Sequence, residues 1–315
     1  MSKQEFIDQL DTAIARIIAD PDVQWESASM DPEVLELIDV ARDVRELPSP
    51  DFKARLRAEL ERNISMSTKS VEFREGFRTL TPYLLPPNEG YLEFLKEVFG
   101  AVQTERTDTG PGRFHAEMRI GDSMIMLGVG AERTMPVMLQ IWVPNVDEVY
   151  ARAVAGGAKS LMEVTEGYGE RFGVVEDSGQ NQWIISTHLN DDAFSIPEQT
   201  IMTWFHPRGA AKFIDFVKRA FNATEVARAD SPEGRVNYAQ IKIGDSVIAL
   251  NEPGDRRMPT ESMVYLYVPD VDALYAQALR AGAKSLSEPK DQSYGDRSAG
   301  VQDEWGNMWY MATPR

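Results

Sequence analysis

The sequence predicts an α+β fold made of two tandem copies of one unit, with a small all-helical segment in front of them. Two observations predict it. Short motifs recur about 125 residues apart: VPNVDEVYARA at 143–153 returns as VPDVDALYAQA at 268–278, and GAKSL at 157–161 returns at 282–286. Strand and helix patterns also follow the same order in both copies. A duplication at this period means that each copy supplies one comparable structural unit.

The order of elements within one copy is strand, helix and three strands, followed by the same series again. Each copy therefore holds two βαβββ modules. In the first copy the pattern predicts strands at 79–85, 101–107, 113–120, 123–129, 137–143, 159–164, 170–176 and 182–187. It predicts helices at 90–100 and 145–157, which end at glycines. In one helix of the second copy Asn222 takes the place of that glycine. A helix on one face of an antiparallel sheet leaves the other face free. We therefore expect curved mixed β-sheets that form cups, with helices on the convex face.

The segment in front of the copies has helical spacing of apolar residues, among them Phe6, Leu10 and Ile14. It resembles neither copy. It is interpreted either as an extension packed on the body or as a module for a protein partner or a homodimer. The predicted organisation is a helical extension at 1–66, a linker at 67–76, a first copy at 77–190, a linker at 191–197 and a second copy at 198–315.

Composition excludes several classes of function. The net charge of −17 argues against nucleic acid and against an anionic membrane surface as partners, because both attract Lys and Arg. The chain has no cysteine, which excludes disulfides, thiolate metal sites and cysteine nucleophiles. The start MSKQEFIDQLD lacks the pattern of a signal peptide, and no apolar run reaches the ~18 residues of a spanning helix. We expect a cytoplasmic protein.

Two βαβββ modules per copy are the layout of the vicinal oxygen chelate superfamily, and several motifs carry the same resemblance. They include FLKEVFGA at 94–101, HAEMRIGDSMIML at 115–127 and a closing D-x-x-G-N-x-W. The second copy has that ending as DEWGNMW at 303–309, whereas DSGQNQW at 177–183 has Gln180 in place of the glycine. The chain resembles a glyoxalase-like subgroup of this superfamily, which also includes bleomycin-resistance proteins and extradiol dioxygenases.

The resemblance implies where a metal would be held. Metal-dependent members fill four positions per copy, on strands that line the cup, with His and Glu. Strand register puts these positions at Leu80, Met126, Met138 and Ile184 in the first copy, and at Met202, Ala249, Met263 and Tyr310 in the second. None of the eight, and no residue one position away, is His, Asp or Glu. We therefore expect no metal ion and no other cofactor, which disfavours glyoxalase I chemistry and extradiol cleavage.

Because side chains alternate along strands, the same register fixes which neighbours face the cups. They are aromatic and Met-rich with a few polar groups, which is the usual make-up of a small-molecule pocket. The candidate ligand-binding residues are Trp204, Tyr265, Tyr267, Tyr310, Gln240, Trp142, Gln140, Met126 and Met138. The alternative interpretation is that these side chains pack as a solid core.

Four side chains on these faces are candidates for proton transfer, namely His206, His115, Tyr238 and Glu117. Imidazole titrates near neutrality and can act as a general acid or base. The two histidines hold non-equivalent positions in different copies, so we expect one cup to be active or liganded and the other degenerate. His188 lies near the junction of the copies and is expected to be exposed.

Two further motifs occur in both copies. YGER at 168–171 and YGDR at 294–297 could be catalytic through their tyrosine, arginine and carboxylate, or could form a loop in which each arginine pairs with an acid. Arg171 and Arg297 are also candidate anchors for an anionic substrate group. Repetition favours the structural interpretation. IGDS, at 120–123 and 243–246, is the other repeated motif.

Three functions follow from these observations. The first is a metal-free protein that binds a small apolar or aromatic molecule in a cup. The second is a metal-independent isomerase or lyase that uses a histidine and a tyrosine of a cup. The third is a regulatory protein whose helical N-terminal segment binds a partner.

Overall fold

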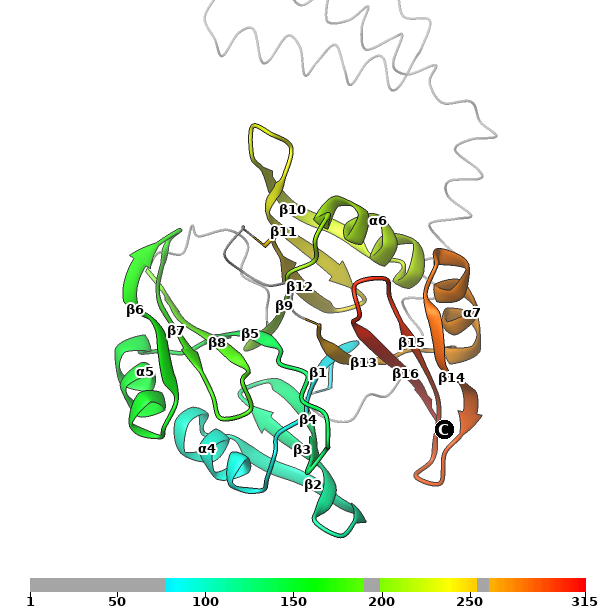
Figure 1. Cartoon of the computed structure of the whole chain (residues 1–315), viewed down its shortest axis with the longest axis horizontal. Helices are drawn as coiled ribbons and strands as arrows, with labels where there is room; N and C mark the ends of the chain where they lie inside the picture. The colour runs from blue at the N-terminus through cyan, green and yellow to red at the C-terminus, as the bar shows by residue number, and fades with distance from the viewer. Residues whose placement is uncertain (1–76, 190–198, 254–260) are drawn as a thin grey trace, which may run out of the picture. The chain divides into compact units, whose positions relative to one another are not determined.

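Residues 77–189, 199–253 and 261–315 are described by a computed structural model, and they belong to one compact unit (Figure 1). The helices predicted within 1–66 and the linkers predicted at 67–76 and 191–197 lie outside the described residues, so these remain predictions. Among the described residues, no helix is both long enough and apolar enough to cross a membrane.

The α+β architecture with two βαβββ modules per copy is confirmed. The first copy contains β1 (Leu80–Leu84), α4 (Gly90–Phe99), β2 (Val102–Gly110), β3 (Arg113–Ile120), β4 (Ser123–Val129), β5 (Met138–Trp142), α5 (Val146–Ala155), β6 (Lys159–Gly167), β7 (Glu170–Glu176) and β8 (Gln182–His188). The second contains β9 (Ile201–Phe205), α6 (Ala210–Phe221), β10 (Thr224–Asp230), β11 (Val236–Ile243), β12 (Ser246–Leu250), β13 (Met263–Tyr267), α7 (Val271–Ala281), β14 (Lys284–Asp291), β15 (Asp296–Gln302) and β16 (Met308–Pro314). As expected, α4 and α6 end in left-handed residues, Gly100 and Asn222.

The copies do not form separate sheets. Sheet 1 has the strand order β14-β15-β16-β13-β1-β4-β3-β2, and sheet 2 has the order β10-β11-β12-β9-β5-β8-β7-β6. Sheet 1 therefore joins the first module of the chain to the last, through the antiparallel pair β1–β13. Sheet 2 joins the two middle modules through the antiparallel pair β5–β9. Each sheet takes one half from each copy.

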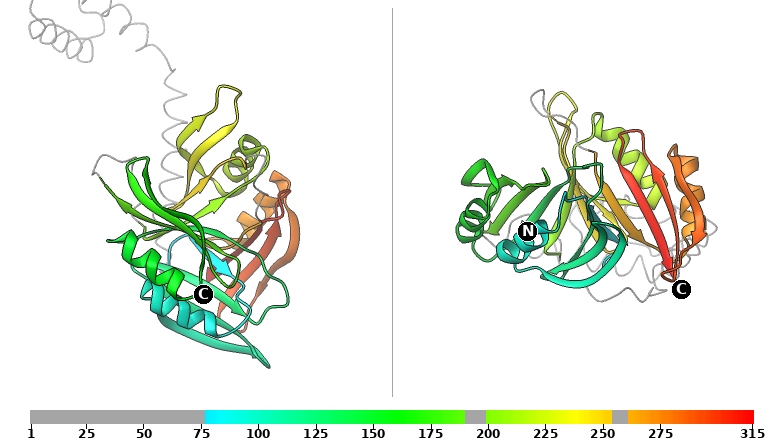
Figure 2. Two further views of the ribbon diagram at one scale, coloured as in Figure 1. Left: turned by 60° about the vertical axis from the view of Figure 1, so that its left-hand side comes forward. Right: turned by 60° about the horizontal axis from the view of Figure 1, so that its bottom comes forward.

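The helices cover one face of each sheet. Helices α4 and α5 pack together over the modules of the first copy, and α6 and α7 pack together over those of the second (Figure 1). The two large hydrophobic cores lie on these helix sides, and each contains a fully buried tryptophan, Trp183 in one and Trp309 in the other. Each sheet is curved, as two further views show (Figure 2). We call the face turned away from the helices the inner face.

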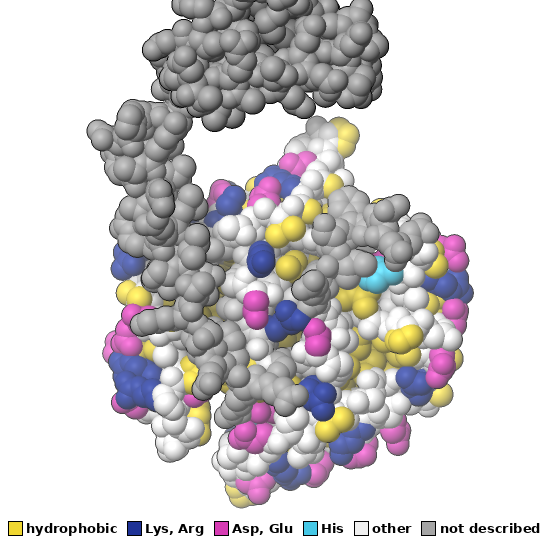
Figure 3. Space-filling model, turned by 180° about the vertical axis from the view of Figure 1, so that it is seen from behind, with side chains coloured by type: hydrophobic (Ala, Val, Ile, Leu, Met, Phe, Trp, Pro, Cys, Tyr) yellow, Lys and Arg dark blue, Asp and Glu magenta, His cyan; other side chains and the backbone are white. Residues whose placement is uncertain are grey.

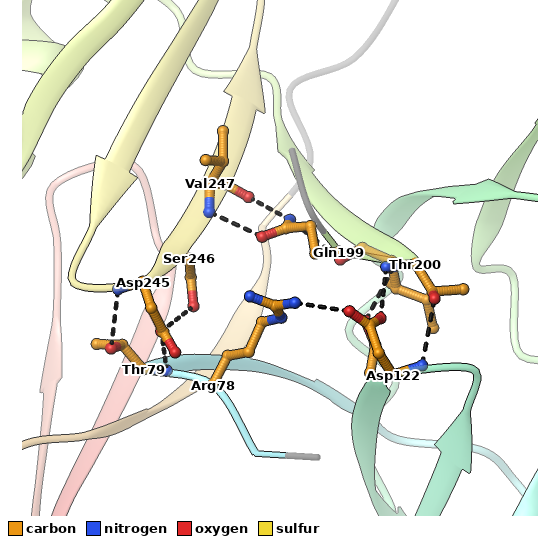
Figure 4. A network of polar contacts seen from close by, with 10 residues as sticks. Arg78, Thr79, Asp122, Gln199, Thr200, Asp245, Ser246 and Val247 are labelled. Atoms are coloured by element: carbon orange, nitrogen blue, oxygen red, sulfur yellow. Dashed lines mark hydrogen bonds and ion pairs between the residues drawn. The ribbon is translucent and has the colours of Figure 1, made fainter. Parts of the chain in front are cut away.

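The repeated IGDS motif holds the two copies together (Figure 4). Asp122 in the β3–β4 turn accepts a hydrogen bond from the backbone N–H of Thr200 at 2.7 Å, and Asp245 in the β11–β12 turn accepts one from the N–H of Thr79 at 2.7 Å. Arg78 also donates to Asp122, at 2.6 Å. Burial opposes ionisation of Asp122, but the hydrogen bonds from Thr200 and Arg78 outweigh it and lower its pKa to about 2. We call these two symmetrical contacts the clasp.

The glycines of the same motif let the turns approach the other copy. A Cβ on Gly121 would lie 2.4 Å from the Thr200 hydroxyl, and a Cβ on Gly244 would lie 2.2 Å from that of Thr79. Both glycines also have positive φ, 58° and 59°. The motif therefore recurs because each copy uses it to bind the other.

The closing D-x-x-G-N-x-W motif forms a buried turn. Asp303 accepts hydrogen bonds from the Trp309 indole at 2.9 Å and the Asn307 amide at 2.8 Å. Burial raises the pKa of Asp303, and these hydrogen bonds oppose the rise. In the first copy Gln180 adopts φ 66°, the left-handed conformation that Gly306 adopts in the second. The motif is structural in both copies.

Candidate functional site

The prediction that Leu80 faces a cup was wrong by one residue. Leu80 lies in the hydrophobic core on the helix side. Thr81 is the inner-face residue, because it pairs directly with Tyr265, which packs on the inner face. Both faces of β1 are buried, so hydrophobicity alone did not distinguish them.

The remaining positions face inward, but the sheets regroup them. Thr81, Met126, Met263 and Tyr310 share the inner face of sheet 1, and Met138, Ile184, Met202 and Ala249 share that of sheet 2. Grouping by copy was therefore wrong, because β1 pairs with β13 and β5 pairs with β9. Thioethers, hydrocarbon side chains, one hydroxyl and one phenol do not fit a first-row divalent cation. Within the described ranges no cluster of three or more His, Asp or Glu side chains could hold a metal ion.

The inner face of sheet 2 carries a hydrogen-bonded network that crosses four strands, β9, β5, β8 and β7. The Glu170 carboxylate accepts from the Trp142 indole N–H at 2.9 Å and from the Gln140 amide at 2.9 Å. The Gln140 amide also donates to the Ser186 hydroxyl at 3.1 Å, and its carbonyl oxygen accepts from the Trp204 indole at 3.1 Å. Gln140 is buried, whereas both tryptophans are partly exposed. The network fixes the orientation of both indole rings.

The network continues onto β11. The Tyr238 ring lies 5.7 Å from the Trp204 ring, and the Gln240 amide donates to the Tyr238 hydroxyl at 2.6 Å. Burial, and to a smaller extent the charge of Glu170, raises the pKa of Tyr238. His206 directly follows β9, is buried, and stacks on Trp204 with ring centroids 6.2 Å apart. Six of the predicted site residues are thus brought together: Trp142, Gln140, Trp204, Tyr238, Gln240 and His206.

His188 was expected to be exposed, and this was wrong. It is the last residue of β8 and pairs with Glu170 on β7. Its ring stacks on Trp142 with centroids 5.7 Å apart, and its side chain is only 23% exposed. Neither ring nitrogen has a hydrogen-bond partner, although Nδ1 lies 3.4 Å from the Glu170 carboxylate. Seen from behind, hydrophobic side chains gather around a histidine on the side that carries β5–β8 (Figure 3).

Glu170 is not among the predicted site residues, although the carboxylate of YGER was considered together with its tyrosine and arginine. The signal was present in the alternation of β7, where Glu170 shares a face with Phe172 and Val174. Arg171 points to the opposite face and binds Asp147 through two hydrogen bonds of 2.8 and 2.7 Å. Arg297 binds Asp272 in the same way, at 2.6 and 2.7 Å. These pairs support the structural interpretation of both arginines rather than a role as anion anchors.

The inner face of sheet 1 carries a different arrangement. The Tyr83 hydroxyl lies 3.1 Å from His115 Nδ1, and His115 Nε2 lies 3.7 Å from the Glu117 carboxylate. Burial, with Tyr310 and Tyr294 nearby, raises the pKa of Tyr83 to about 12, so this phenol is neutral at pH 7. Tyr83 was not predicted as a site residue. Because His115 belongs to sheet 1 and His206 to sheet 2, the two histidines do not act as one pair.

Three predicted tyrosines surround this group. Tyr265 and Tyr267 have ring centroids 5.1 Å apart, and Tyr265 pairs with Tyr310 across neighbouring strands. Burial, followed by the nearby Tyr294, raises the pKa of Tyr265 well above its ordinary value. Met126 packs in the same cluster. The inner face of sheet 1 is therefore rich in phenols, whereas that of sheet 2 is rich in indoles.

The fold and its inner faces define a class of protein with tandem βαβββ modules and two curved mixed sheets. The family model described as "Glyoxalase/Bleomycin resistance protein/Dioxygenase superfamily" matches residues 208–311. An uncharacterized protein of Mycobacterium bovis (Mb0911c) is 34% identical over 116 residues, which cover 33% of this chain and 76% of that protein. An uncharacterized protein of Mycobacterium tuberculosis (Rv0887c) is 34% identical over 116 residues, with 33% and 68% covered. The chain belongs to this superfamily, and the resemblance found in its motifs is confirmed.

Solved structures show the same fold at low sequence identity. Glyoxalase I from Zea mays matches with a TM-score of 0.60 and 14% identity, over 74% of this chain and 92% of that one. A putative dioxygenase from Bacillus subtilis matches with a TM-score of 0.53 and 15% identity, over 74% and 84%. At this sequence identity the similarity establishes the architecture, and the function has to be argued from the side chains of the site.

Proposed function

We propose that the protein binds a small, flat, largely apolar molecule on the inner face of sheet 2, without a metal ion. The observation that carries this proposal is the network in which Glu170 and Gln140 hold the indoles of Trp142 and Trp204. Rings that are fixed in orientation and only partly buried offer stacking surface at little cost in side-chain entropy. The side chains at the positions that hold a metal in relatives support the metal-free part of the proposal.

Calorimetric titration with quinoline, a neutral planar probe, tests binding. We expect saturable binding to the full chain, and weaker binding by at least about tenfold in Trp204→Phe, which removes the indole N–H and part of the ring surface. Trp305→Phe is the matched control, because Trp305 packs on the helix side and donates to the backbone of Arg208. Equal loss in both variants, or no binding of any planar probe, would count against the site.

Metal content tests the other half of the proposal. Protein purified without chelator should contain no stoichiometric metal, and Zn²⁺, Ni²⁺, Fe²⁺ and Mn²⁺ should leave its Tm unchanged. A ligand that binds only the native state must raise Tm by mass action. A stoichiometric ion or a clear upward shift would contradict metal-free binding.

A metal-independent isomerase or lyase is the second candidate, and a specific contact favours it. On the inner face of sheet 1, the two ring nitrogens of His115 face Tyr83 and Glu117, which suits transfer of a proton through the imidazole. Once a substrate is found, His115→Gln should lower kcat strongly. If His206→Ala lowers kcat instead, the reaction takes place on the inner face of sheet 2 and not on that of sheet 1. The third candidate, a regulatory protein, depends on residues 1–66, and deletion of that segment without loss of partner association would contradict it.

A further inference from the structure

We propose that the molecule bound on the inner face of sheet 2 is an organic cation, with its ring against the indoles and its positive group facing Glu170. This inference rests on the proposed function and adds to it the chemical class of the ligand. The observation behind it is a carboxylate whose two side-chain hydrogen-bond donors, an indole and an amide, are both neutral.

Glu170 has no cationic partner from Lys or Arg in the described part of the chain. Its hydrogen-bond donors there are an indole and an amide, and its third neighbour is the His188 ring. A carboxylate offers about four acceptor positions, so two stay available. The side chain is 18% exposed, which allows contact with a ligand at the surface of the sheet. The donors fix the position of the charge without neutralising it.

The other charged side chains of the same strand are neutralised. Arg171 binds Asp147 on the helix side, and Glu176 lies 3.9 Å from the Lys159 ammonium. Glu170 is therefore the exception on β7, and it is also the one that lies among the aromatic side chains. A fixed, uncompensated carboxylate in partly buried surroundings favours an incoming positive charge more than the same group in water would.

The aromatic side chains favour the same sign of charge. The face of an indole ring carries negative potential and therefore attracts cations. Trp142 donates its N–H to Glu170, and Trp204 donates to Gln140, so both indoles stay beside the carboxylate. The net charge of −17 also attracts cations toward the molecule.

The duplicated sequence repeats this arrangement. Asp296 on β15 holds the place in YGDR that Glu170 holds in YGER, and it pairs with Pro314 on β16 as Glu170 pairs with His188 on β8. Its charge also acts on Tyr265, which occupies the place of Gln140. Both inner faces thus carry a carboxylate at this position near aromatic rings, although the rings differ.

A matched pair of probes tests the sign of the charge. N-methylquinolinium and quinoline share one ring system, and at pH 8 the first is a cation and the second is neutral. We expect calorimetry on the full chain to give N-methylquinolinium a Kd at least about tenfold lower than quinoline, with the ratio shrinking as salt is added.

Variants of Glu170 test whether this carboxylate causes the preference for the cationic probe. Glu170→Gln should bring the ratio of the two Kd values close to one, and Glu170→Asp, which keeps the charge, should retain part of it. Glu176→Gln is the control and should retain the full ratio. If quinoline binds and N-methylquinolinium binds no tighter, the cation inference is overturned while the proposed function stands. A preference that persists in Glu170→Gln also overturns it, and no binding of either probe overturns both.

Discussion

At the residue scale, the two copies form the turn of the D-x-x-G-N-x-W motif with different residues. Gln180 holds the left-handed conformation, φ 66°, that Gly306 holds at φ 91°. A residue with a Cβ is strained there by roughly 1–2 kcal/mol, and the exposed Gln180 side chain gains little packing in return. We expect Gln180→Gly to raise the free energy of unfolding by about 0.5–1 kcal/mol, since the flexibility of glycine in the unfolded chain offsets part of the gain.

Chemical denaturation with tryptophan fluorescence measures this change. The matched control is Gly306→Ala, which should destabilise the protein, because its Cβ would lie 2.7 Å from the Glu261 side chain in addition to the strain of positive φ. An unchanged or lower stability of Gln180→Gly would show that Gln180 contributes contacts that outweigh its strain.

Residue-scale prediction from sequence succeeded where one face of a strand is polar and failed where both faces are buried. The alternation of β11 assigned Tyr238 and Gln240 correctly, because Ala239 and Ile241 mark the helix side. On β1 Leu80 and Leu84 alternate with Thr81 and Tyr83, but neither face is exposed, and Leu80 was placed on the wrong face. The alternation of β7 places Glu170 on the inner face, but its contacts with Trp142 and Gln140 join distant parts of the chain and could not be predicted.

At the scale of elements, the β3–β4 and β11–β12 turns act as connectors between the copies. Gly121 has both a positive φ and a close contact with Thr200, so a Cβ there adds a collision to the backbone strain. We expect Gly121→Ala to lower the free energy of unfolding by about 2–4 kcal/mol, the sum of both effects.

Gly112 separates the two effects. It has a similar φ of 69°, but a Cβ there would meet no atom within 4 Å. Gly112→Ala should therefore cost only the strain, about 1 kcal/mol. Thermal unfolding of both variants measures the difference, and equal losses would mean that the Thr200 contact has little energetic weight.

The order of elements was predictable throughout the described residues, because helices and strands are local patterns. The partners of β1 and β5 were not, because β13 and β9 are joined to them by contacts between distant parts of the chain. The IGDS repeat was a visible sign of this arrangement, but four residues in a turn do not reveal what they bind.

At the scale of the whole molecule, each sheet needs both copies. If the chain is divided between the copies, the two halves should assemble when they are expressed together, because β1 must pair with β13 and β5 with β9. We expect the halves to purify as a 1:1 complex that unfolds in one transition. Size-exclusion chromatography with light scattering checks this, and two folded monomers that elute separately would contradict the exchanged pairing.

The exchanged pairing also separates the unit that was duplicated from the unit that can specialise. Each copy contributes half of the phenol-rich face and half of the indole-rich face, so the two modules of one copy belong to different faces. A residue change in one module alters one face, and the residues that meet the same ligand come from the outer two modules or from the inner two. The duplication therefore relates one copy to the next, whereas each binding face combines one module from each copy.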